Sequence, residues 1–241
     1  FVFRTIVLII SACYAVLAIR DESYRPKLSW VSASLLLFMI IIGVADIFAV
    51  NPFKAFWSNF ERMEGFVALV HFFLYFLVLS SVLKTQEIWN KLLATTVGAS
   101  FIMSIYSILQ ITGKIAINQG GVRVDGTLGN AAYLGIYTVF HIFFASLLFF
   151  RSRYNWQKIL LSMSIILNLI VLYYTATRGA ILGLMGGALI SFLFLVFKSE
   201  KGDRIRKVAL FGVVSLFVFV GFFTVVKDTS FVRNNPVLSR F

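Results

Sequence analysis

The sequence has little cysteine, histidine or charge, and these shortages exclude whole classes of protein. Its single cysteine, Cys13, lies within an apolar run and supports neither a disulfide nor a metal cluster. The two histidines, His71 and His141, are too far apart in the sequence to show metal-ligand spacing. Charged residues make up 13% of the chain, whereas a soluble domain has about 25%. A disulfide-stapled domain and a water-soluble fold are therefore excluded.

Apolar residues are what the chain has in abundance. Of its 241 residues, 60% are hydrophobic and 27 are phenylalanine, and the mean hydropathy is +0.92. A helix needs about 20 apolar residues to cross a bilayer, and a membrane barrel would show short alternating strands instead. The sequence therefore predicts an all-α polytopic membrane protein with one transmembrane domain over residues 1–241. The eight predicted spans are residues 2–19, 30–49, 65–83, 92–112, 131–150, 159–176, 180–197 and 208–226.

Basic residues alternate along the connectors between these spans. One set of connectors carries 13 Lys and Arg residues and the other set carries 8. The positive-inside rule places the richer set in the cytoplasm and the poorer set outside. The net charge of +12 then reflects membrane topology, and a nucleic-acid partner is not predicted. The richer set comprises residues 20–29, 84–91, 151–158 and 198–207, and the poorer set comprises 50–64, 113–130, 177–179 and 227–241.

The first notable motif is the glycine-rich stretch 120–135, which contains Arg123 and Asn130. Glycines allow a backbone to approach a ligand closely, and Asn130 is a good N-cap for the following span. The N-terminus of that helix would face outward and offer its free N–H groups to an anion. The alternative is an ordinary turn with a solvated Arg123, since glycine turns before helices are common.

The second motif is the turn at residues 177–179, which places Arg178 between two spans on the predicted outer side. The guanidinium and the N-terminus of span 180–197 would both stabilise a phosphate. The alternative is that Arg178 snorkels to lipid headgroups. Small residues at Gly179, Gly183 and Gly187 form a stripe that predicts helix–helix packing.

The third motif is residues 51–65, where aromatic side chains recur at helical spacing. The pattern predicts an amphipathic interfacial helix over about residues 52–63. Arg62 is a secondary candidate to face a substrate cavity, and Glu64 is another.

Together these stretches resemble the O-antigen ligase and O-antigen polymerase superfamily of membrane glycosyltransferases. The family pattern is an Arg, then Gly-Thr-x-Gly-Asn opening a span, then a Ser/Thr-x-x-Arg-Gly-Ala turn one hairpin later. The matching residues are Arg123, then Gly126 to Asn130, then Thr175 to Ala180. The likeness runs from about Asp46 to the end of the chain, and Ala131 stands where relatives often have Pro.

The resemblance implies a membrane region of the GT-C glycosyltransferase type in the bacterial inner membrane, with substrate loops on the periplasmic side. It implies metal-independent transfer of a glycan from undecaprenyl diphosphate to lipid A-core, a growing polysaccharide or a protein hydroxyl, without a cofactor. Arg123 and Arg178 would bind the diphosphate, with Asn130 as a secondary candidate. The family's catalytic His lies in a large outer loop, which we expect beyond Phe241. We therefore expect this chain to be a fragment that is inactive alone.

Two other functions remain open from the sequence. One is a transporter or flippase for an anionic lipid-linked substrate, although the spans offer few polar residues for a path. The other is a membrane subunit without a substrate, in which each outward arginine would be individually replaceable.

Overall fold

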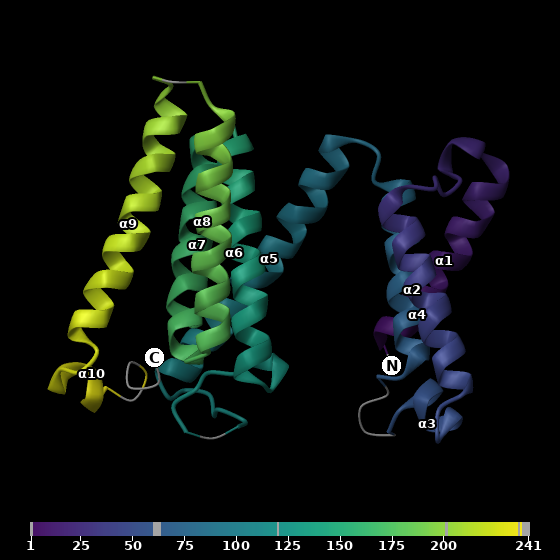
Figure 1. Cartoon of the computed structure of the whole chain (residues 1–241), viewed down its shortest axis with the longest axis horizontal. Helices are drawn as coiled ribbons and strands as arrows, with labels where there is room; N and C mark the ends of the chain where they lie inside the picture. Colours follow the sequence, from purple (N-terminus) through teal and green to yellow (C-terminus); the bar gives the residue numbers. More distant parts are fainter. Residues whose placement is uncertain (1, 60–63, 120, 201, 236, 238–241) are drawn as a thin grey trace. The chain divides into compact units, whose positions relative to one another are not determined.

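The computed structural model describes residues 2–59, 64–119, 121–200, 202–235 and 237, and the regular structure of this part of the chain is helical throughout (Figure 1). Its fold is that of an all-α membrane protein, as predicted. The elements are α1 (Val2–Arg20), η1 (Glu22–Tyr24), α2 (Trp30–Ile47), α3 (Pro52–Trp57), α4 (Phe66–Val82), α5 (Gln86–Ile111), η2 (Gly126–Leu128), α6 (Ala131–Arg151), α7 (Asn155–Thr175), α8 (Arg178–Lys198), α9 (Arg204–Val226) and α10 (Ser230–Asn234).

Each of the eight predicted spans coincides with one of the long helices. Seven of the described helices are long and apolar enough to cross a membrane. The remaining helix, α4, is apolar but has only 17 residues. At 1.5 Å per residue its length is about 26 Å, a few ångström less than a hydrocarbon core of about 30 Å. Seven of the predicted spans therefore correspond to helices that are long and apolar enough to cross a membrane, and the third corresponds to a shorter apolar helix; their crossing of a membrane stays a prediction.

The predicted interfacial helix is also shorter than expected. It begins at Pro52, where Asn51 caps it by accepting a hydrogen bond from Lys54 N at 3.1 Å. It ends at Trp57, because Ser58 adopts a positive φ of 62°, which is incompatible with a right-handed helix. The aromatic spacing on which the prediction of residues 52–63 rested does not reveal this backbone turn. Arg62 lies outside the described residues.

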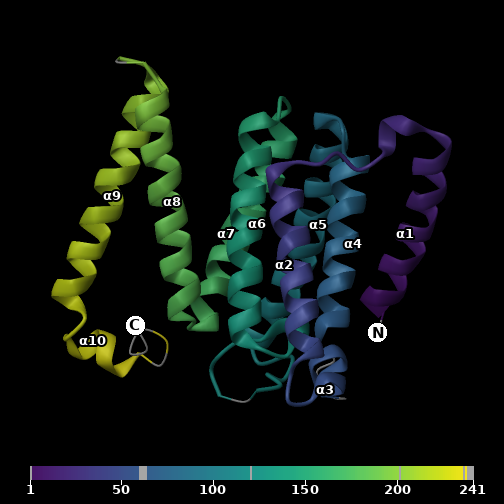
Figure 2. The same cartoon turned by 45° about the vertical axis from the view of Figure 1, so that its right-hand side comes forward.

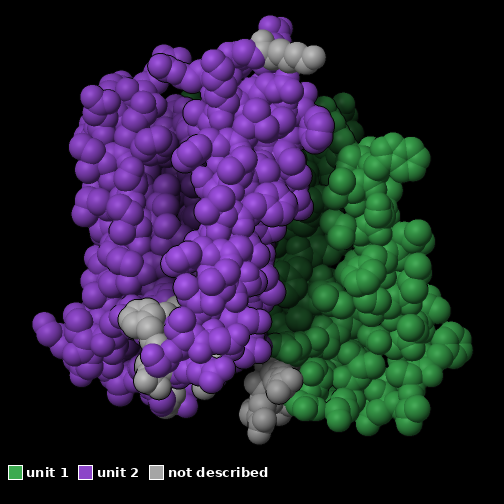
Figure 3. All heavy atoms as spheres, turned by 60° about the vertical axis from the view of Figure 1, so that its left-hand side comes forward, with its two compact units in different colours: residues 1–89 green, residues 90–241 purple. Residues whose placement is uncertain are grey.

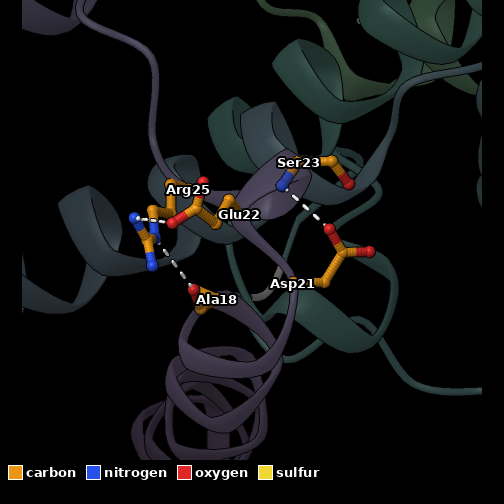
Figure 4. A network of polar contacts seen from close by, with 5 residues as sticks. All are labelled: Ala18, Asp21, Glu22, Ser23 and Arg25. Atoms are coloured by element: carbon orange, nitrogen blue, oxygen red, sulfur yellow. Dashed lines mark hydrogen bonds and ion pairs between the residues drawn. The ribbon is translucent and has the colours of Figure 1, made fainter.

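The chain divides into two compact units, residues 1–89 and 90–241 (Figure 3). In unit 1, α4 packs against both α1 and α2. The α1–α2 connection is held by local polar contacts that Figure 4 shows: the Ser23 N–H donates to Asp21 at 2.9 Å, and Arg25 pairs with Glu22 at 2.8 Å. Lys84, just after α4, donates to the Ser23 hydroxyl at 2.9 Å.

Unit 2 is built from two antiparallel helix hairpins, α6–α7 and α8–α9, together with α5 and the short α10 (Figures 1 and 2). Val97 of α5 packs with Ala145 and Leu148 of α6 in one buried apolar cluster. Polar groups also link the helices, because Ser100 of α5 donates to Asn168 of α7 at 2.8 Å. Such bonds are typical of helix association within membranes, where hydrophobic burial between helices contributes little.

Close helix packing in unit 2 depends on individual glycines. A Cβ at Gly187 would lie 2.8 Å from the Phe143 ring, so this glycine lets α8 approach α6. Gly179 and Gly183 have no such neighbour within 4 Å. The predicted packing stripe is therefore confirmed at Gly187 and wrong at the other two positions. Regular spacing fixes a shared helix face, but it does not say how far along that face the partner helix stays in contact.

Candidate functional site

The turn between α7 and α8 is tight and brings several chain segments together. Ala176 closes α7 in the left-handed conformation, with φ 47° and ψ 42°, and is buried. The next residue, Thr177, precedes α8, but its side chain makes no capping hydrogen bond to that helix. Its hydroxyl lies instead 3.2 Å from the carbonyl oxygen of Ala131, the first residue of α6. The start of α6 is thereby tied to the α7–α8 turn.

Arg123 comes from the loop between α5 and α6 and docks on the same turn. Its Nε donates to the carbonyl oxygen of Thr175 at 2.9 Å, and its Nη2 donates to the Thr177 hydroxyl at 3.1 Å. The neighbouring Val124 N–H donates to the carbonyl oxygen of Tyr174 at 3.1 Å. A cation that bonds the last carbonyls of a helix complements the negative end of the helix dipole. The half-buried Arg123 therefore acts as a C-terminal cap of α7.

Arg178 is the first residue of α8, as the sequence predicts for the N-terminal end of that span. Its side chain is exposed, and no acidic residue occurs in the first turn of the helix. A positive side chain and the positive end of the helix dipole thus coincide, an arrangement that favours an anion. Because Arg123 bonds Thr177, the structure brings the two predicted arginines to the same turn.

A large cavity begins beside Arg178. It has a volume of about 840 Å³ and lies among the end of α7, the first half of α8, the second half of α9, and α10. Its walls are mostly apolar, and ligand-binding pockets usually measure roughly 300–1,000 Å³. Farther along, α8 and α9 meet closely, where a Cβ at Gly212 would lie 2.7 Å from the Phe192 ring. The residues that line the cavity include Tyr173, Arg178, Met185, Phe219, Phe223 and Val232.

The short helix α10 contributes to one side of this cavity. Thr229, its N-cap residue, and Val232 both line the space, and Val232 is buried. After α10, the Asn235 side chain lies 3.5 Å from the Tyr173 hydroxyl at the end of α7. The segment that follows α9 therefore returns to the α7–α8 turn.

Asn130 caps α6, as the sequence predicts. Its Oδ1 accepts hydrogen bonds from Ala132 N at 2.8 Å and from Tyr133 N at 3.3 Å. Just before it, Gly129 has a φ of 66°, a conformation that favours glycine. Because Asn130 Oδ1 already accepts two backbone hydrogen bonds, its side chain positions the helix start, and a ligand-binding role for it stays a prediction.

A buried carboxylate holds the loop that carries Arg123, and the sequence interpretation missed it. Asp125 is 0% exposed, and its two oxygens accept from Gln110 Nε2 at 2.8 Å and from Gln119 N at 2.9 Å. Gln110, near the end of α5, also donates to Ala116 O and accepts from Gly126 N at 2.8 Å. The sequence does show a glutamine at the end of an apolar span and an aspartate in the next loop, two residues that could form a hydrogen bond. Their pairing across 15 residues is not visible in the sequence.

The two histidines make hydrogen bonds only within their own helices in the described structure. His71 Nδ1 lies 2.6 Å from Val67 O, and His141 Nδ1 lies 2.7 Å from Tyr137 O. Each partner is four residues earlier on the same helix.

Fold and composition together define a multi-pass helical membrane protein. No protein-family model matches the chain, and no curated protein or solved structure matches it. The likeness to O-antigen ligases and polymerases accordingly rests on the motifs alone, and diphosphate binding by Arg123 and Arg178 stays a prediction.

Proposed function

We propose that this chain binds an undecaprenyl-diphosphate-linked glycan at the α7–α8 turn and serves in metal-independent glycan transfer at the outer face of the bacterial inner membrane. One observation carries the proposal: Arg178 stands at the N-terminus of α8 and on the wall of a large, mostly apolar cavity. A lipid diphosphate has the matching chemistry, since its anionic head suits a guanidinium and a helix N-terminus while its hydrocarbon chain suits apolar walls.

The cavity walls fit a polyprenyl chain better than a small polar solute. Side chains such as Leu182, Phe219 and Phe222 offer dispersion contacts but no hydrogen bonds. Arg178 adds charge to this lining, and Tyr173, Thr224 and Thr229 add hydroxyl groups. A ligand with one charged end and a long apolar remainder can satisfy both parts of the lining at once.

Arg123 supports the proposed site in two ways. Through Thr175 and Thr177 it fixes the turn from which Arg178 projects. It also adds a positive charge to the same turn, which lowers the energy of a bound diphosphate. In this proposal Arg178 contacts the diphosphate. Arg123 holds the turn in place and adds a second positive charge near the diphosphate.

The proposed chemistry needs stabilisation of the leaving group. The acceptor hydroxyl oxygen attacks the anomeric carbon of the glycan while the bond from that carbon to the diphosphate oxygen breaks. Negative charge grows on the diphosphate during this step, and preorganised positive groups stabilise the transition state. Removal of the acceptor proton requires a general base. Since both described histidines are bonded within their own helices, we assign that role to neither of them.

Binding of undecaprenyl diphosphate to the purified chain tests the proposal. Arg178→Ala should weaken binding by about 10- to 150-fold, the equivalent of one charged hydrogen-bonded contact of about 1.5–3 kcal/mol. Arg178→Lys should recover part of the loss, because lysine keeps the charge without the bidentate geometry. The matched control is Lys227→Ala, which removes an exposed cation just after α9. Equal affinity for the wild type and Arg178→Ala would exclude the proposed role.

Transfer can be measured separately from binding. In a protein that also supplies the general base for the acceptor hydroxyl, the rate of glycan transfer should fall in the same order as binding: wild type, then Arg178→Lys, then Arg178→Ala. Flux of labelled lipid diphosphate through proteoliposomes without any transfer would favour a transporter instead.

A further inference from the structure

Unit 2 has a strongly basic end, opposite the end that carries the Arg178 turn. The turns of its two hairpins, between α6 and α7 and between α8 and α9, both lie there (Figures 1 and 2). We call this set of side chains the basic end. It consists of Arg151, Arg153, Lys158, Lys198, Arg204, Arg206 and Lys207, of which five are exposed and two are half-buried.

These cations lack acidic partners in the described structure. None of the seven lies within ion-pairing distance of a carboxylate among the residues that the structure describes. The nearby Asp203 uses an oxygen to cap α9, accepting from Ile205 N at 3.2 Å. Arg151 donates to the neutral Asn90 side chain at 3.0 Å. The α8–α9 turn also holds Glu200 and Asp203, but the seven cations outnumber them and pair with neither, so the described residues of the basic end keep a net positive charge.

Three of the cations stand where they oppose helix stability. Arg204, Arg206 and Lys207 all fall in the first turn of α9, which contains no acidic residue. Positive side chains in the first turn of a helix repel the positive end of its dipole. Their presence is thus not explained by the stability of α9, and an external anion would reverse the unfavourable electrostatics.

Aromatic side chains accompany the charges. Tyr154 and Trp156, at the start of α7, are 63% and 61% exposed. Tyr and Trp with one apolar and one polar side concentrate at the headgroup level of membranes. The combination places the basic end at the depth where lipid headgroups lie.

The corresponding loop of unit 1 is different. Arg25 pairs with Glu22 at 2.8 Å (Figure 4). Lys84 donates to the Ser23 hydroxyl, and its Nζ lies 3.4 Å above the Tyr24 ring. These cations are already matched within the protein, so they have less to gain from an outside anion.

We propose that the basic end of unit 2 is a binding surface for anionic phospholipid headgroups of the adjacent membrane leaflet. Clusters of basic residues directly beside membrane helices attract anionic lipids, and the three arginine and lysine residues of the first turn of α9 form the centre of this surface. The inference is independent of the proposed glycan transfer, since it concerns the opposite end of the helices.

The test is titration of the full chain in a non-ionic detergent with short-chain phosphatidylglycerol, with phosphatidylcholine of the same chain length as the neutral comparison. Arg204→Gln/Lys207→Gln should weaken phosphatidylglycerol binding roughly 25-fold, from about fivefold per charge. The matched control, Arg25→Gln/Lys84→Gln, removes the same charge from the paired loop of unit 1 and should change the affinity less than twofold. Circular dichroism should show unchanged helix content in the first variant, because its substitutions relieve repulsion with the dipole of α9.

Three results would overturn the proposal. The first is equal binding of phosphatidylglycerol and phosphatidylcholine. The second is an equal loss in both double variants, which would indicate attraction by net charge alone. The third is competition by inorganic phosphate at the same concentration as the lipid, which would indicate a site for free anions. If the α9 variant does not fold, Arg153→Gln/Lys158→Gln provides the same comparison on α7, and there a loss of less than twofold would count against the surface.

Discussion

The two compact units use their polar side chains differently. In unit 1 the contacts around the α1–α2 loop involve exposed residues such as Asp21 and Arg25. In unit 2 several contacts that join distant segments are buried or half-buried, including those of Asp125 and Arg123. Buried polar groups are costly unless their partners are in place, and this cost rises within a membrane. The difference indicates that unit 2 keeps costly buried polar groups at the end where the candidate site lies.

The largest difference between the units should appear when a buried and an exposed carboxylate are removed. Asp125→Ala leaves Gln119 N without its acceptor, and Gln110 Nε2 keeps only its bond to Ala116 O. We expect a loss of about 3 kcal/mol in the free energy of unfolding, since each unsatisfied buried group costs about 1–3 kcal/mol. Denaturant unfolding in detergent, followed by circular dichroism, measures it.

The comparison variant is Asp21→Ala in unit 1. Its carboxylate is exposed, so the change should stay within about 0.5 kcal/mol. Similar losses for both variants would remove the distinction between the units. Asp125→Asn should fall between them, because the amide keeps one acceptor oxygen but presents a donor to a second donor.

A smaller difference should separate two arginines. Arg123→Ala removes the side-chain donors to Thr175 O and Thr177 Oγ1, and we expect a loss of about 2 kcal/mol. Arg25→Ala breaks an exposed ion pair with Glu22 and should cost at most about 1 kcal/mol. Thermal unfolding of both variants in one detergent provides the measurement. If Arg123→Ala is the milder change, Arg123 does not brace the α7–α8 turn.

Two glycines of unit 2 allow a comparison within one fold. A Cβ at Gly135 would lie 3.1 Å from Ala180 Cβ and 3.2 Å from Thr177 Cβ, atoms fixed to the backbone of the α7–α8 turn and α8. Gly135→Ala should therefore destabilise the protein by about 1–2 kcal/mol through overpacking. Gly183→Ala meets nothing within 4 Å and should stabilise it by roughly 0.5–1 kcal/mol through helix propensity. Unfolding midpoints that shift in the same direction would contradict the α6–α8 contact.

The sequence predicts the helices well because span length and apolar composition are local properties. The N-cap role of Asn130 and the place of Arg178 at the start of α8 follow from the same local rules. The early end of α3 at Ser58 was missed because a single positive φ leaves no mark in aromatic spacing. The dependence of packing on Gly135 was missed as well, since it is set by the crossing of α6 over the turn before α8.

The candidate site could be predicted only in part, because it depends on contacts between segments far apart in the sequence. The sequence identifies Arg123 and Arg178 as candidates because both are basic residues in connectors on the predicted outer side. The bonds of Arg123 to the end of α7 span more than 50 residues, and the cavity needs α7, α8, α9 and α10 together. Such features depend on how the helices pack, which periodicity does not determine.

The smallest expected effect concerns the exposed carboxylate of unit 1. The hydrogen bonds from the Ser23 side chain and backbone hold the pKa of Asp21 below its ordinary value of 3.8, and the nearby positive charge of Lys84 adds a little. Because the folded pKa is lowered, any stability that Asp21 contributes is present above about pH 4 and is lost as the pH falls through the folded value. Carboxyl NMR of the labelled protein should show Ser23→Ala raising the Asp21 pKa more than Lys84→Gln does. The reverse order would mean that the charge of Lys84, and not hydrogen bonding from Ser23, sets the Asp21 pKa; Figure 4 shows the bond from the Ser23 backbone.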